Sequence, residues 1–235
     1  MTTSSPPAHF TTDNGMNGLD RDLAVLIGKV LGLKPKITGV PIDQVIPGFQ
    51  ADRYDVVVSQ FKPTTDRAKV LDFVDYAQSG TTLGLLASNP DKLTPKKLCG
   101  HSVGVQKGSS QAVVVLPDLN KKCQKEGQKP VTKKTFRDST SALLALRSSR
   151  VDGVLIDSPV MGYAAKRSNG KVVTAGTLRS NPVSIGTLKG SKLIKPVQKA
   201  LELLHENGAY EKVFAKWGMK ANTVTKFSIN AVQKD

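Results

Sequence analysis

The spacing of apolar positions predicts helices and strands in alternation along the first part of the chain. Apolar residues at positions 19, 23, 26, 27, 30 and 31 recur every three or four residues, which predicts an amphipathic helix over 19–32. A short strand at 36–40 and a short helix at 42–50 are expected next. Residues 54–59 are apolar on both faces, so they predict a buried strand. This alternation is typical of a parallel sheet covered by helices.

The same pattern begins again after residue 100. It predicts strands at 102–106, 131–136 and 153–156, a helix at 109–116 that stops near Pro117, and a helix at 139–149. Each half has a helix, then an Arg-x-Asp sequence, then a buried strand with a polar residue at its end. That residue is Ser59 in the first half and Asp157 in the second. We interpret the chain as an α/β protein of two similar lobes.

Two extended stretches, 80–88 and 172–187, are expected to be crossover strands between the lobes. The first lobe is therefore predicted to be discontinuous, with residues 1–87 and 182–235, and the second lobe to contain residues 88–181. Two helical patterns close the chain, and their return to the first lobe explains why that lobe would need both ends of the chain.

The composition fits a packed, water-exposed protein. Among 235 residues, 23% are charged and 39% are hydrophobic, which is ordinary for a globular chain. No apolar run approaches the ~18 residues of a membrane span. The first residues have neither the basic nor the apolar region of an export signal, so such a signal is expected to be absent from this sequence.

The net charge of +15 is unevenly distributed. Residues 88–181 contain 17 Lys and Arg against 6 Asp and Glu, and lysines are dense at 121–129. Nucleic-acid binding would favour aromatic side chains among these lysines for base stacking, and the stretch has none. A solvated helix end and loop is therefore the preferred interpretation, and no nucleic-acid partner is expected.

Polar side chains follow the predicted strands at the ends where ligands bind in open α/β sheets. The candidate ligand-binding residues from these strand ends are Ser59, Gln60, Lys62, Gln106, Ser109, Ser110 and Asp157. Arg67 follows the first set at the start of a short helix. An arginine can hold a carboxylate with two hydrogen bonds, a helix start at Ser109 and Ser110 offers amides to an anion, and Asp157 suits an ammonium group. Together they complement a zwitterion.

Each of these residues also has a simpler interpretation. Arg67 could be a charge on a helix face, Ser109 a helix cap and Asp157 a loop cap. Matching positions in the two halves favour the binding interpretation. Catalytic signatures are poor, because the three histidines lie apart and no phosphate-binding glycine motif occurs. Neither a metal nor a nucleotide cofactor is expected.

The two cysteines, Cys99 and Cys123, both lie in the second predicted lobe. An even number suits one disulfide. By closing a loop and reducing the entropy of the unfolded chain, it would stabilise the folded state by about 3 kcal/mol. Two free thiols are the alternative in a reducing compartment.

Several motifs together resemble one family over nearly the whole chain. They are Pro6-Pro7, Asn17-Gly18-Leu19-Asp20-Arg21-Asp22-Leu23-Ala24, Ile46-Pro47-Gly48-Phe49, Arg53-Tyr54-Asp55-Val56-Val57-Val58-Ser59, Thr65-Asp66-Arg67-Ala68, Val103-Gly104-Val105-Gln106-Lys107-Gly108-Ser109-Ser110, Val151-Asp152-Gly153-Val154-Leu155-Ile156-Asp157 and Gly208-Ala209-Tyr210-Glu211. The chain is similar to the extracellular solute-binding proteins, family 3, of polar amino-acid ABC transporters. The resemblance implies a two-lobed type II periplasmic binding protein fold with two crossover strands.

The resemblance also implies a function and a location. It indicates a monomer that closes by a hinge around an amino acid or related small carboxylate and delivers it to the membrane permease of an ABC importer. It indicates the periplasm or the outer face of the cell membrane, and the cysteine pair is similar to that of actinobacterial members, which are lipoproteins. Exported proteins keep disulfides, so a Cys99–Cys123 bridge is favoured.

The family's binding residues match this chain residue by residue. Arg67 matches the arginine that binds the ligand carboxylate, and Asp157 matches the aspartate that binds the ligand ammonium group. Ser109 and Ser110 match helix-start residues that donate to the same carboxylate. These assignments agree with those made from the residues alone.

Four matching positions depart from the family pattern. Ser5 and Ile42 stand where aromatics usually stack on the ligand, and Gln60 and Lys62 stand where small residues usually contact its main chain. Lys62 would repel a cationic ligand such as arginine or lysine, or it could point to solvent. The family begins with a strand before Pro6, where this chain has only residues 1–4, and a tail strand at 226–232 could compensate.

Two rival functions belong to other classes. One is an enzyme on the same fold, similar to cyclohexadienyl dehydratase, although the sequence offers no second carboxylate near Asp157 as a general acid. The other is a charge-driven surface adhesin, whose binding would depend steeply on salt.

Overall fold

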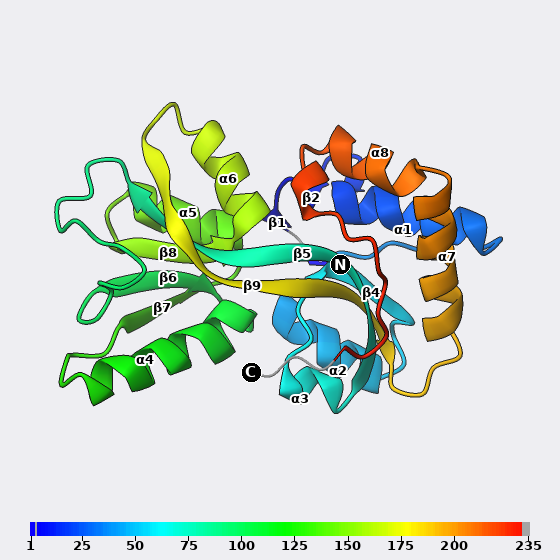
Figure 1. Ribbon diagram of the computed structural model, residues 1–235, viewed down its shortest axis with the longest axis horizontal. Helices are drawn as coiled ribbons and strands as arrows, with labels where there is room; N and C mark the ends of the chain where they lie inside the picture. Colours follow the sequence, from blue (N-terminus) through cyan, green and yellow to red (C-terminus); the bar gives the residue numbers. More distant parts are fainter. Residues whose placement is uncertain (3, 232–235) are drawn as a thin grey trace. The chain divides into compact units, whose positions relative to one another are not determined.

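The computed structural model describes residues 1–2 and 4–231, and its chain divides into two compact units (Figure 1). Unit 1 comprises Met1–Ser79 and Asn181–Asp235, and unit 2 comprises Gly80–Ser180. Two long strands, β5 (Leu71–Leu86) and β9 (Val172–Leu188), each contribute residues to both units. The α/β class and the two crossover strands expected from the sequence are thus present.

Unit 1 has helices on both faces of its strands. Its elements are η1 (Ile42–Gln44), α1 (Leu19–Val30), α2 (Val45–Gln50), β4 (Val56–Phe61), α3 (Thr65–Ala68), α7 (Ile194–Glu206), α8 (Ala209–Lys216) and η3 (Lys220–Asn222), with the first part of β5 and the last part of β9. Alternation along β4 places Val58 in the core with α1, α7 and α8, and Val57 in the core with α2. Both faces are therefore buried.

A small antiparallel sheet at the chain start is absent from the sequence predictions. Its strands are β1 (Ser4–Ser5), β2 (His9–Thr12) and β3 (Gly15–Asn17). These strands are mostly polar and too short for a periodic pattern. They are recognised only from their pairing in the structure, for example Phe10 opposite Asn17.

The strand predicted at 36–40 does not form. Residues 33–41 have no helix or strand in unit 1, and most of them are exposed. A strand needs a hydrogen-bonding neighbour, and residues 36–40 bond through their main chain to Met1, at the Thr38 carbonyl and the Val40 amide. The tail predicted as a strand over 226–232 forms an isolated bridge between Ile229 and Val74, and residue 232 lies outside the described residues.

The parallel sheet predicted from the alternation is confirmed in unit 2. Strand β6 (Ser102–Gln106) pairs in parallel with β7 (Thr132–Phe136) and with β8 (Gly153–Asp157), and β8 pairs antiparallel with β5. In unit 1 the prediction is wrong for β4, which pairs antiparallel with β9. The missing strand at 36–40 removes the neighbour that the alternation implied.

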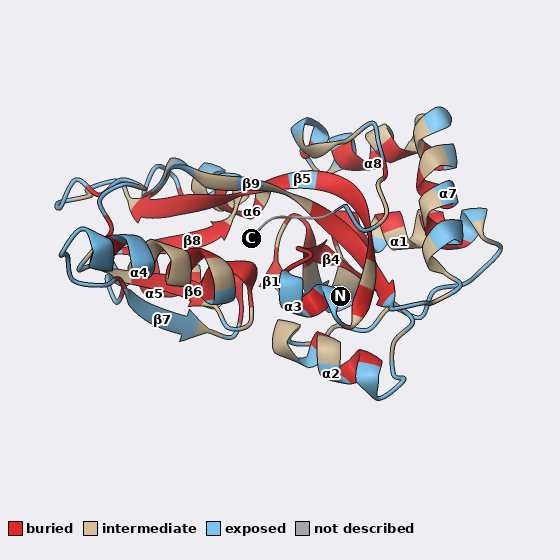
Figure 2. Ribbon diagram, turned by 60° about the horizontal axis from the view of Figure 1, so that its bottom comes forward, coloured by how far each residue is buried: buried red, intermediate tan, exposed pale blue. Residues whose placement is uncertain are grey.

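Helices cover both faces of the unit 2 sheet. They are η2 (Gln111–Val115) and α4 (Leu116–Lys125) on one face, and α5 (Ser139–Arg147) and α6 (Ser158–Lys166) on the other. Leu155 packs with the residues of α4, whereas Val154 and Ile156 pack with those of α5 and α6. Figure 2 shows β8 buried and β7 largely exposed, as expected for a central strand and an edge strand.

The helix predicted to stop at Pro117 continues to Lys125. Residues Gln111–Val115 form a π-helix, and Pro117 then lies in the first turn of α4. Proline lacks an N–H and its ring clashes with the carbonyl four residues earlier in a regular α-helix, but it is tolerated in a first turn. The change from π to α geometry supplies such a turn inside a continuous helix.

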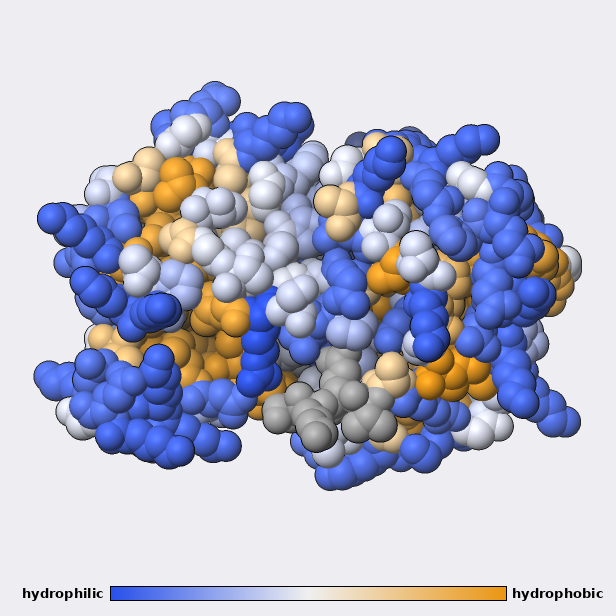
Figure 3. Space-filling model, viewed as in Figure 1, coloured by the Kyte–Doolittle hydropathy of each residue, from blue (hydrophilic) through white to orange (hydrophobic). Residues whose placement is uncertain are grey.

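The surface is dominated by hydrophilic side chains, which cover much of both units on the face shown in Figure 3. Within residues 1–2 and 4–231, no helix is long and apolar enough to cross a membrane. The same residues contain no group of three His, Cys, Asp or Glu side chains arranged to hold a metal ion.

Candidate functional site

Arg67 is fixed by the loop that joins β4 to α3. Thr64 caps α3, because its hydroxyl accepts a hydrogen bond from the amide of Arg67 at 3.4 Å. The Arg67 guanidinium donates to the main-chain carbonyl of Lys62 at 2.8 Å, and its central carbon lies 3.8 Å from the centre of the Phe61 ring. Only 8% of Arg67 is exposed. It is therefore not a solvent-exposed charge on a helix face.

Lys62 is also buried, with 5% of its surface exposed. The alternative in which this side chain extends into solvent is therefore wrong. Two cationic residues, Lys62 and Arg67, lie in one short buried loop of unit 1. Cationic side chains can bind a ligand group of negative charge, so this loop is a candidate for such a contact.

Ser59 and Gln60 face the interior of unit 1. The hydroxyl of Ser59 accepts from the amide of Thr2 at 2.7 Å and donates to the Thr2 hydroxyl at 2.9 Å. Gln60 has a left-handed backbone with φ of 48°, and its side-chain amide donates to Tyr76 Oη at 3.0 Å. Its Oε1 is buried and has no hydrogen-bond partner among the described residues. These side chains thus brace the end of β4.

A buried polar network continues from this point. Tyr76 Oη donates to Asp20 Oδ1 at 2.6 Å, His9 Nδ1 lies 2.6 Å from Asp20 Oδ2, and His9 Nε2 lies 2.5 Å from the Thr2 hydroxyl. Burial and the adjacent Asp20 carboxylate raise the pKa of Tyr76 well above its usual value. Tyr76 therefore stays a neutral donor, and the network links the chain start to the end of β4.

The two positions expected to replace stacking aromatics lie in separate elements of unit 1. Ser5 is in β1 opposite His9 and is 6% exposed. Ile42 begins η1 and packs against the core that contains Phe49. Their part in binding stays a prediction.

In unit 2, Gln106, Ser109 and Ser110 form the turn between β6 and η2. The carbonyl of Gln106 accepts from the amide of Ser109 at 3.1 Å, and the Ser109 hydroxyl accepts from the amide of Ala112 at 3.3 Å. Ser109 therefore acts as a helix cap. The amides of Ser110 and Gln111 belong to the first turn, where a helix provides no acceptor of its own.

Asp157 ends β8 and is held by a residue that the sequence did not single out. Gln111 Nε2 donates to Asp157 Oδ1 at 2.8 Å and lies 3.4 Å from the Thr81 hydroxyl. Although Asp157 stands at the N-cap of α6, its side chain makes no capping hydrogen bond. The loop-cap interpretation of Asp157 is therefore wrong, and the carboxylate is oriented by Gln111 instead.

The structure thus assembles the predicted residues into two groups. Ser59, Gln60, Lys62 and Arg67 lie along one strand end and loop of unit 1, and Gln106, Ser109, Ser110 and Asp157 lie at neighbouring strand ends of unit 2. The sequence did not identify Gln111, His9 or Tyr76. Gln111 directly follows the predicted Ser pair, which was a usable signal, whereas the contacts of His9 and Tyr76 depend on burial.

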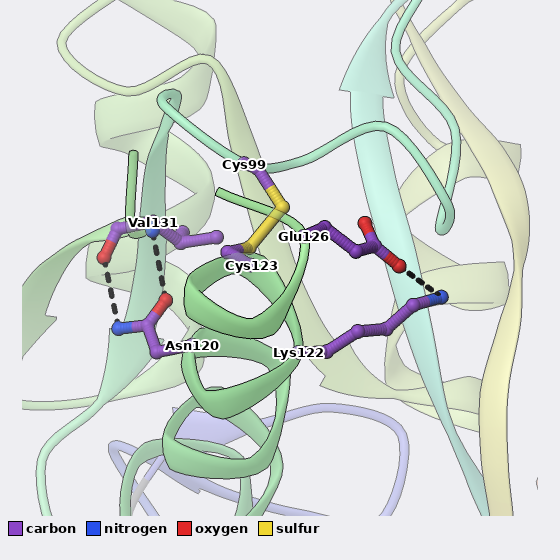
Figure 4. The surroundings of a disulfide bond; sticks show 6 residues. All are labelled: Cys99, Asn120, Lys122, Cys123, Glu126 and Val131. Carbon is purple, nitrogen blue, oxygen red and sulfur yellow. Dashed lines mark hydrogen bonds and ion pairs between the residues drawn. A yellow bond between two sulfur atoms is a disulfide. The ribbon is translucent and has the colours of Figure 1, made fainter. Parts of the chain in front are cut away.

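The disulfide favoured from the sequence is confirmed. Cys99 and Cys123 are bonded, with their Cα atoms 5.7 Å apart. Figure 4 shows that α4 is also tied by Asn120, whose side chain accepts from the amide of Val131 at 2.8 Å and donates to the Val131 carbonyl at 3.2 Å. Two links therefore attach α4 to the segments that flank it.

Comparison with known proteins shows one consistent family. The profile of the bacterial extracellular solute-binding proteins, family 3, matches residues 1–220. The arginine-binding protein ArgT of Corynebacterium glutamicum is 26% identical over 227 residues, which are 96% of this chain and 75% of that protein.

Solved structures agree with this result. An ancestral arginine-binding protein bound to arginine superposes with a TM-score of 0.82 and 32% identity, covering 92% of this chain and 95% of the other. A second structure, described as an ancestral arginine-binding protein bound to glutamine, has a TM-score of 0.79 and 30% identity. It covers 93% of this chain and 95% of its own. An ancestral amino-acid-binding protein, described as a precursor of cyclohexadienyl dehydratase, has a TM-score of 0.78 and 29% identity, and the match covers 92% of each chain.

Proposed function

Because the chain belongs to the bacterial extracellular solute-binding proteins, family 3, we propose that it binds a free amino acid and delivers it to an ABC importer. The observation that carries this proposal is the buried guanidinium of Arg67, which is positioned by the main-chain carbonyl of Lys62 and the ring of Phe61. A guanidinium held in this way is suited to a carboxylate, with which it can form two parallel hydrogen bonds. Relatives named as arginine- and cystine-binding proteins support the ligand class.

We assign the ammonium group of the ligand to Asp157. Gln111 donates to one carboxylate oxygen of Asp157, which fixes the orientation of the group without neutralising it. The amides of Ser110 and Gln111 would support the ligand carboxylate together with Arg67. Closure of the two lobes around the ligand, as expected from the sequence, remains part of this proposal.

The side-chain specificity is assigned to Lys62. A buried ammonium group near Arg67 repels a second cation in the ligand and attracts an anionic or polar group. The expected ligands are therefore amino acids with neutral or acidic side chains, rather than arginine or lysine. The neighbour described as bound to glutamine supports a neutral side chain on this fold.

The partners and location follow from the family. We propose that a membrane permease receives the ligand, that the protein acts as a monomer at the outer face of the cell membrane or in the periplasm, and that a lipid anchors it. No cofactor and no specific nucleic acid take part. The enzyme alternative is not favoured, because the relatives are named as binding proteins.

The test is calorimetric titration with the natural amino acids, after a thermal-shift screen in which a ligand raises the melting temperature. Arg67→Ala is expected to weaken binding of the ligand found by about 30-fold or more, because loss of a buried charge partner costs about 2–5 kcal/mol. Asp157→Asn should weaken the binding of amino acids more than the binding of analogues that lack the ammonium group. Lys62→Ser should improve binding of arginine relative to glutamate.

Lys69→Ala is the matched control, because Lys69 is a nearby cation that is 70% exposed and pairs with Asp66 on the surface. It is expected to leave affinity unchanged. Equal affinity of the Arg67→Ala and Lys69→Ala proteins would contradict the proposed site. Conversion of prephenate or arogenate to an aromatic product would instead establish the enzyme.

A further inference from the structure

Gln60 has a backbone conformation that is unusual for its place in the chain. Its φ of 48° lies in the left-handed region, which a residue other than glycine rarely adopts. Among the described non-glycine residues with positive φ, Gln60 lies inside a strand, β4, whereas the others lie outside helices and strands. A left-handed residue within a strand costs free energy, so the surrounding structure must hold it in place.

The left-handed residue coincides with a β-bulge in β4. Four steps along β4, from Val57 to Phe61, match only two steps along β9. Bulges redirect a strand and are common beside functional sites. This bulge comes directly before Phe61 and Lys62, and both of these residues contact the Arg67 guanidinium. The conformation of residue 60 therefore sets the direction in which the support of Arg67 leaves the strand.

The hydroxyl of Tyr76 holds Gln60 in this conformation. Tyr76 Oη accepts from the main-chain amide of Gln60 at 3.1 Å and from its side-chain Nε2 at 3.0 Å. One oxygen thus binds the backbone and the side chain of the same residue. Tyr76 is fully buried, in surroundings where hydrogen bonds are stronger than in water.

The Tyr76 hydroxyl is itself held by a buried carboxylate. It donates to Asp20 Oδ1 at 2.6 Å, and His9 Nδ1 lies 2.6 Å from the other Asp20 oxygen. Because the hydroxyl gives its one proton to Asp20, it can only accept from Gln60, as the two bonds from Gln60 require. The network therefore fixes both the position and the hydrogen-bonding role of the Tyr76 oxygen.

Gln60 carries a second cost besides its backbone. Because its Nε2 donates to Tyr76, the amide cannot turn over, and its Oε1 is buried without a hydrogen-bond partner among the described residues. A buried polar atom without a partner costs free energy. Two unfavourable features thus meet in the residue that precedes the support of Arg67, and strain of this kind clusters at functional sites.

We propose that Tyr76 is a positioning residue for ligand binding, which acts through Gln60 on the loop that supports Arg67. This inference rests on the proposed function, in which Arg67 binds the ligand carboxylate. By keeping Gln60 left-handed, the Tyr76 hydroxyl fixes the Phe61 ring and the Lys62 carbonyl where the guanidinium meets them.

The effect of losing the hydroxyl is specific to this loop. The Lys62 carbonyl accepts from the amide of Thr64 at 3.0 Å as well as from Arg67, so it joins the bulge to the cap of α3. Without the Tyr76 hydroxyl, the loop would populate conformations in which Arg67 is displaced. Only the fraction of molecules with an ordered loop would bind, and the measured affinity would fall by that fraction.

The first measurement is made without ligand and compares Tyr76→Phe with Tyr210→Phe. Tyr210 is an equally buried tyrosine of unit 1, and its hydroxyl donates to the Tyr76 carbonyl and accepts from the Val224 amide. Both variants are expected to lower the melting temperature. Amide hydrogen exchange at Thr64 and Arg67 should be about tenfold faster in Tyr76→Phe than in Tyr210→Phe, because a hydrogen bond that orders the loop is lost. Equal exchange in the two variants would overturn the proposal.

The second measurement is a double-substitution cycle with Gln60→Gly. Glycine adopts a positive φ without strain, so a protein that carries Gln60→Gly needs less support from Tyr76. In calorimetric titration with L-glutamine, Tyr76→Phe should weaken binding by about three- to tenfold in the natural protein. In the protein with Gln60→Gly the same substitution should cost less than about twofold. Equal losses in both backgrounds would show that Tyr76 does not act through Gln60.

A comparison of Gln60→Ala with Gln60→Gly keeps the Tyr76 hydroxyl, so it decides the case even where Tyr76→Phe does not fold. Both substitutions remove the same side-chain hydrogen bond, but alanine is strained at positive φ. Exchange at Thr64 should therefore be faster with alanine than with glycine, and equal exchange would contradict a role for the left-handed backbone.

The measurements also separate this proposal from the proposed function. Absence of L-glutamine binding to the natural protein would contradict the expected ligand class, and the exchange comparisons would still decide the role of Tyr76. If Tyr76→Phe binds L-glutamine as tightly as the natural protein does, the proposed function stands and the positioning role of Tyr76 is overturned.

Discussion

Asp75 is a carboxylate that the binding proposal does not use. It lies on β5 in unit 1, only 7% of it is exposed, and its Oδ1 accepts from the Ser184 hydroxyl at 2.6 Å. Burial raises the pKa of Asp75 and the bond from Ser184 lowers it, with burial the larger effect. The folded state therefore favours the protonated form.

Asp75→Asn is expected to stabilise the protein at pH 7. A raised pKa in the folded state means that stability is fully present below the unfolded value of 3.8 and is lost as the pH rises through the folded value. Asparagine keeps an acceptor for Ser184 without the charge. Urea unfolding of both proteins at pH 3.5 and pH 7 tests this, and the gain should be smaller at the lower pH. A variant that is less stable at pH 7 would contradict it.

At the residue scale, the sequence predicted the candidate site residues that can be recognised from their position after a buried strand. Arg67 and Asp157 were identified because they follow buried strands, and the structure excludes the simpler interpretation of each. Gln111 and His9 were not identified, because their contacts arise only after distant segments meet. His9, for example, lies in β2 of the small sheet that no pattern indicated, and it contacts Asp20 of α1.

At the scale of elements, α4 depends on links that cross from one segment to another. The disulfide joins Cys123 in α4 to Cys99, which precedes β6, and Asn120 holds the residue before β7. The ion pairs that Lys121 and Lys122 make with Asp118 and Glu126 are at the surface, where such pairs contribute little to stability. The disulfide is therefore expected to matter for the stability of unit 2.

Replacing both cysteines with serine is expected to cost about 3 kcal/mol, the chain entropy of the closed loop, and to lower the melting temperature by about 6–12 °C. A reducing agent should lower the melting temperature of the natural protein to the same extent and leave the double variant unchanged. Differential scanning calorimetry in both conditions measures this. No change on reduction, with alkylation showing two free thiols, would contradict the expectation.

Element prediction succeeded where a segment carries its own periodicity. The helix α1 begins at the predicted residue, and β8 is the predicted buried strand. It failed for residues 36–40, because a strand depends on a neighbour that the segment itself does not encode. It also failed at Pro117, because the sequence does not reveal the π-helix that precedes the proline.

At the scale of the whole molecule, the positive charge lies mainly in one unit. Residues 80–180 contain 17 Lys and Arg against 6 Asp and Glu, whereas the remaining residues are nearly balanced in the first segment and moderately basic in the last. Such a unit attracts any polyanion at low ionic strength. That attraction by itself carries no specificity.

Binding to duplex DNA is therefore expected to be weak and to disappear by about 0.2 M salt, since it rests on counterion release. Fluorescence anisotropy with two duplexes of unrelated sequence should give equal affinities at each salt concentration. Affinity that survives in 0.2 M salt, or that differs between the duplexes, would indicate a nucleic-acid partner after all.

The discontinuity of unit 1 has a consequence for the order in which the protein folds. Unit 2 is made from one continuous segment, Gly80–Ser180, and all of it is synthesised before α7 and α8. Leu201 and Phe214, which complete the core around Leu23 of α1, arrive last. The apolar face of α1 consequently lacks these partners until the roughly 160 residues between α1 and α7 have been synthesised. This early segment of unit 1 is thus among the last to be fully buried, and its apolar face is where a chaperone is expected to bind the nascent chain.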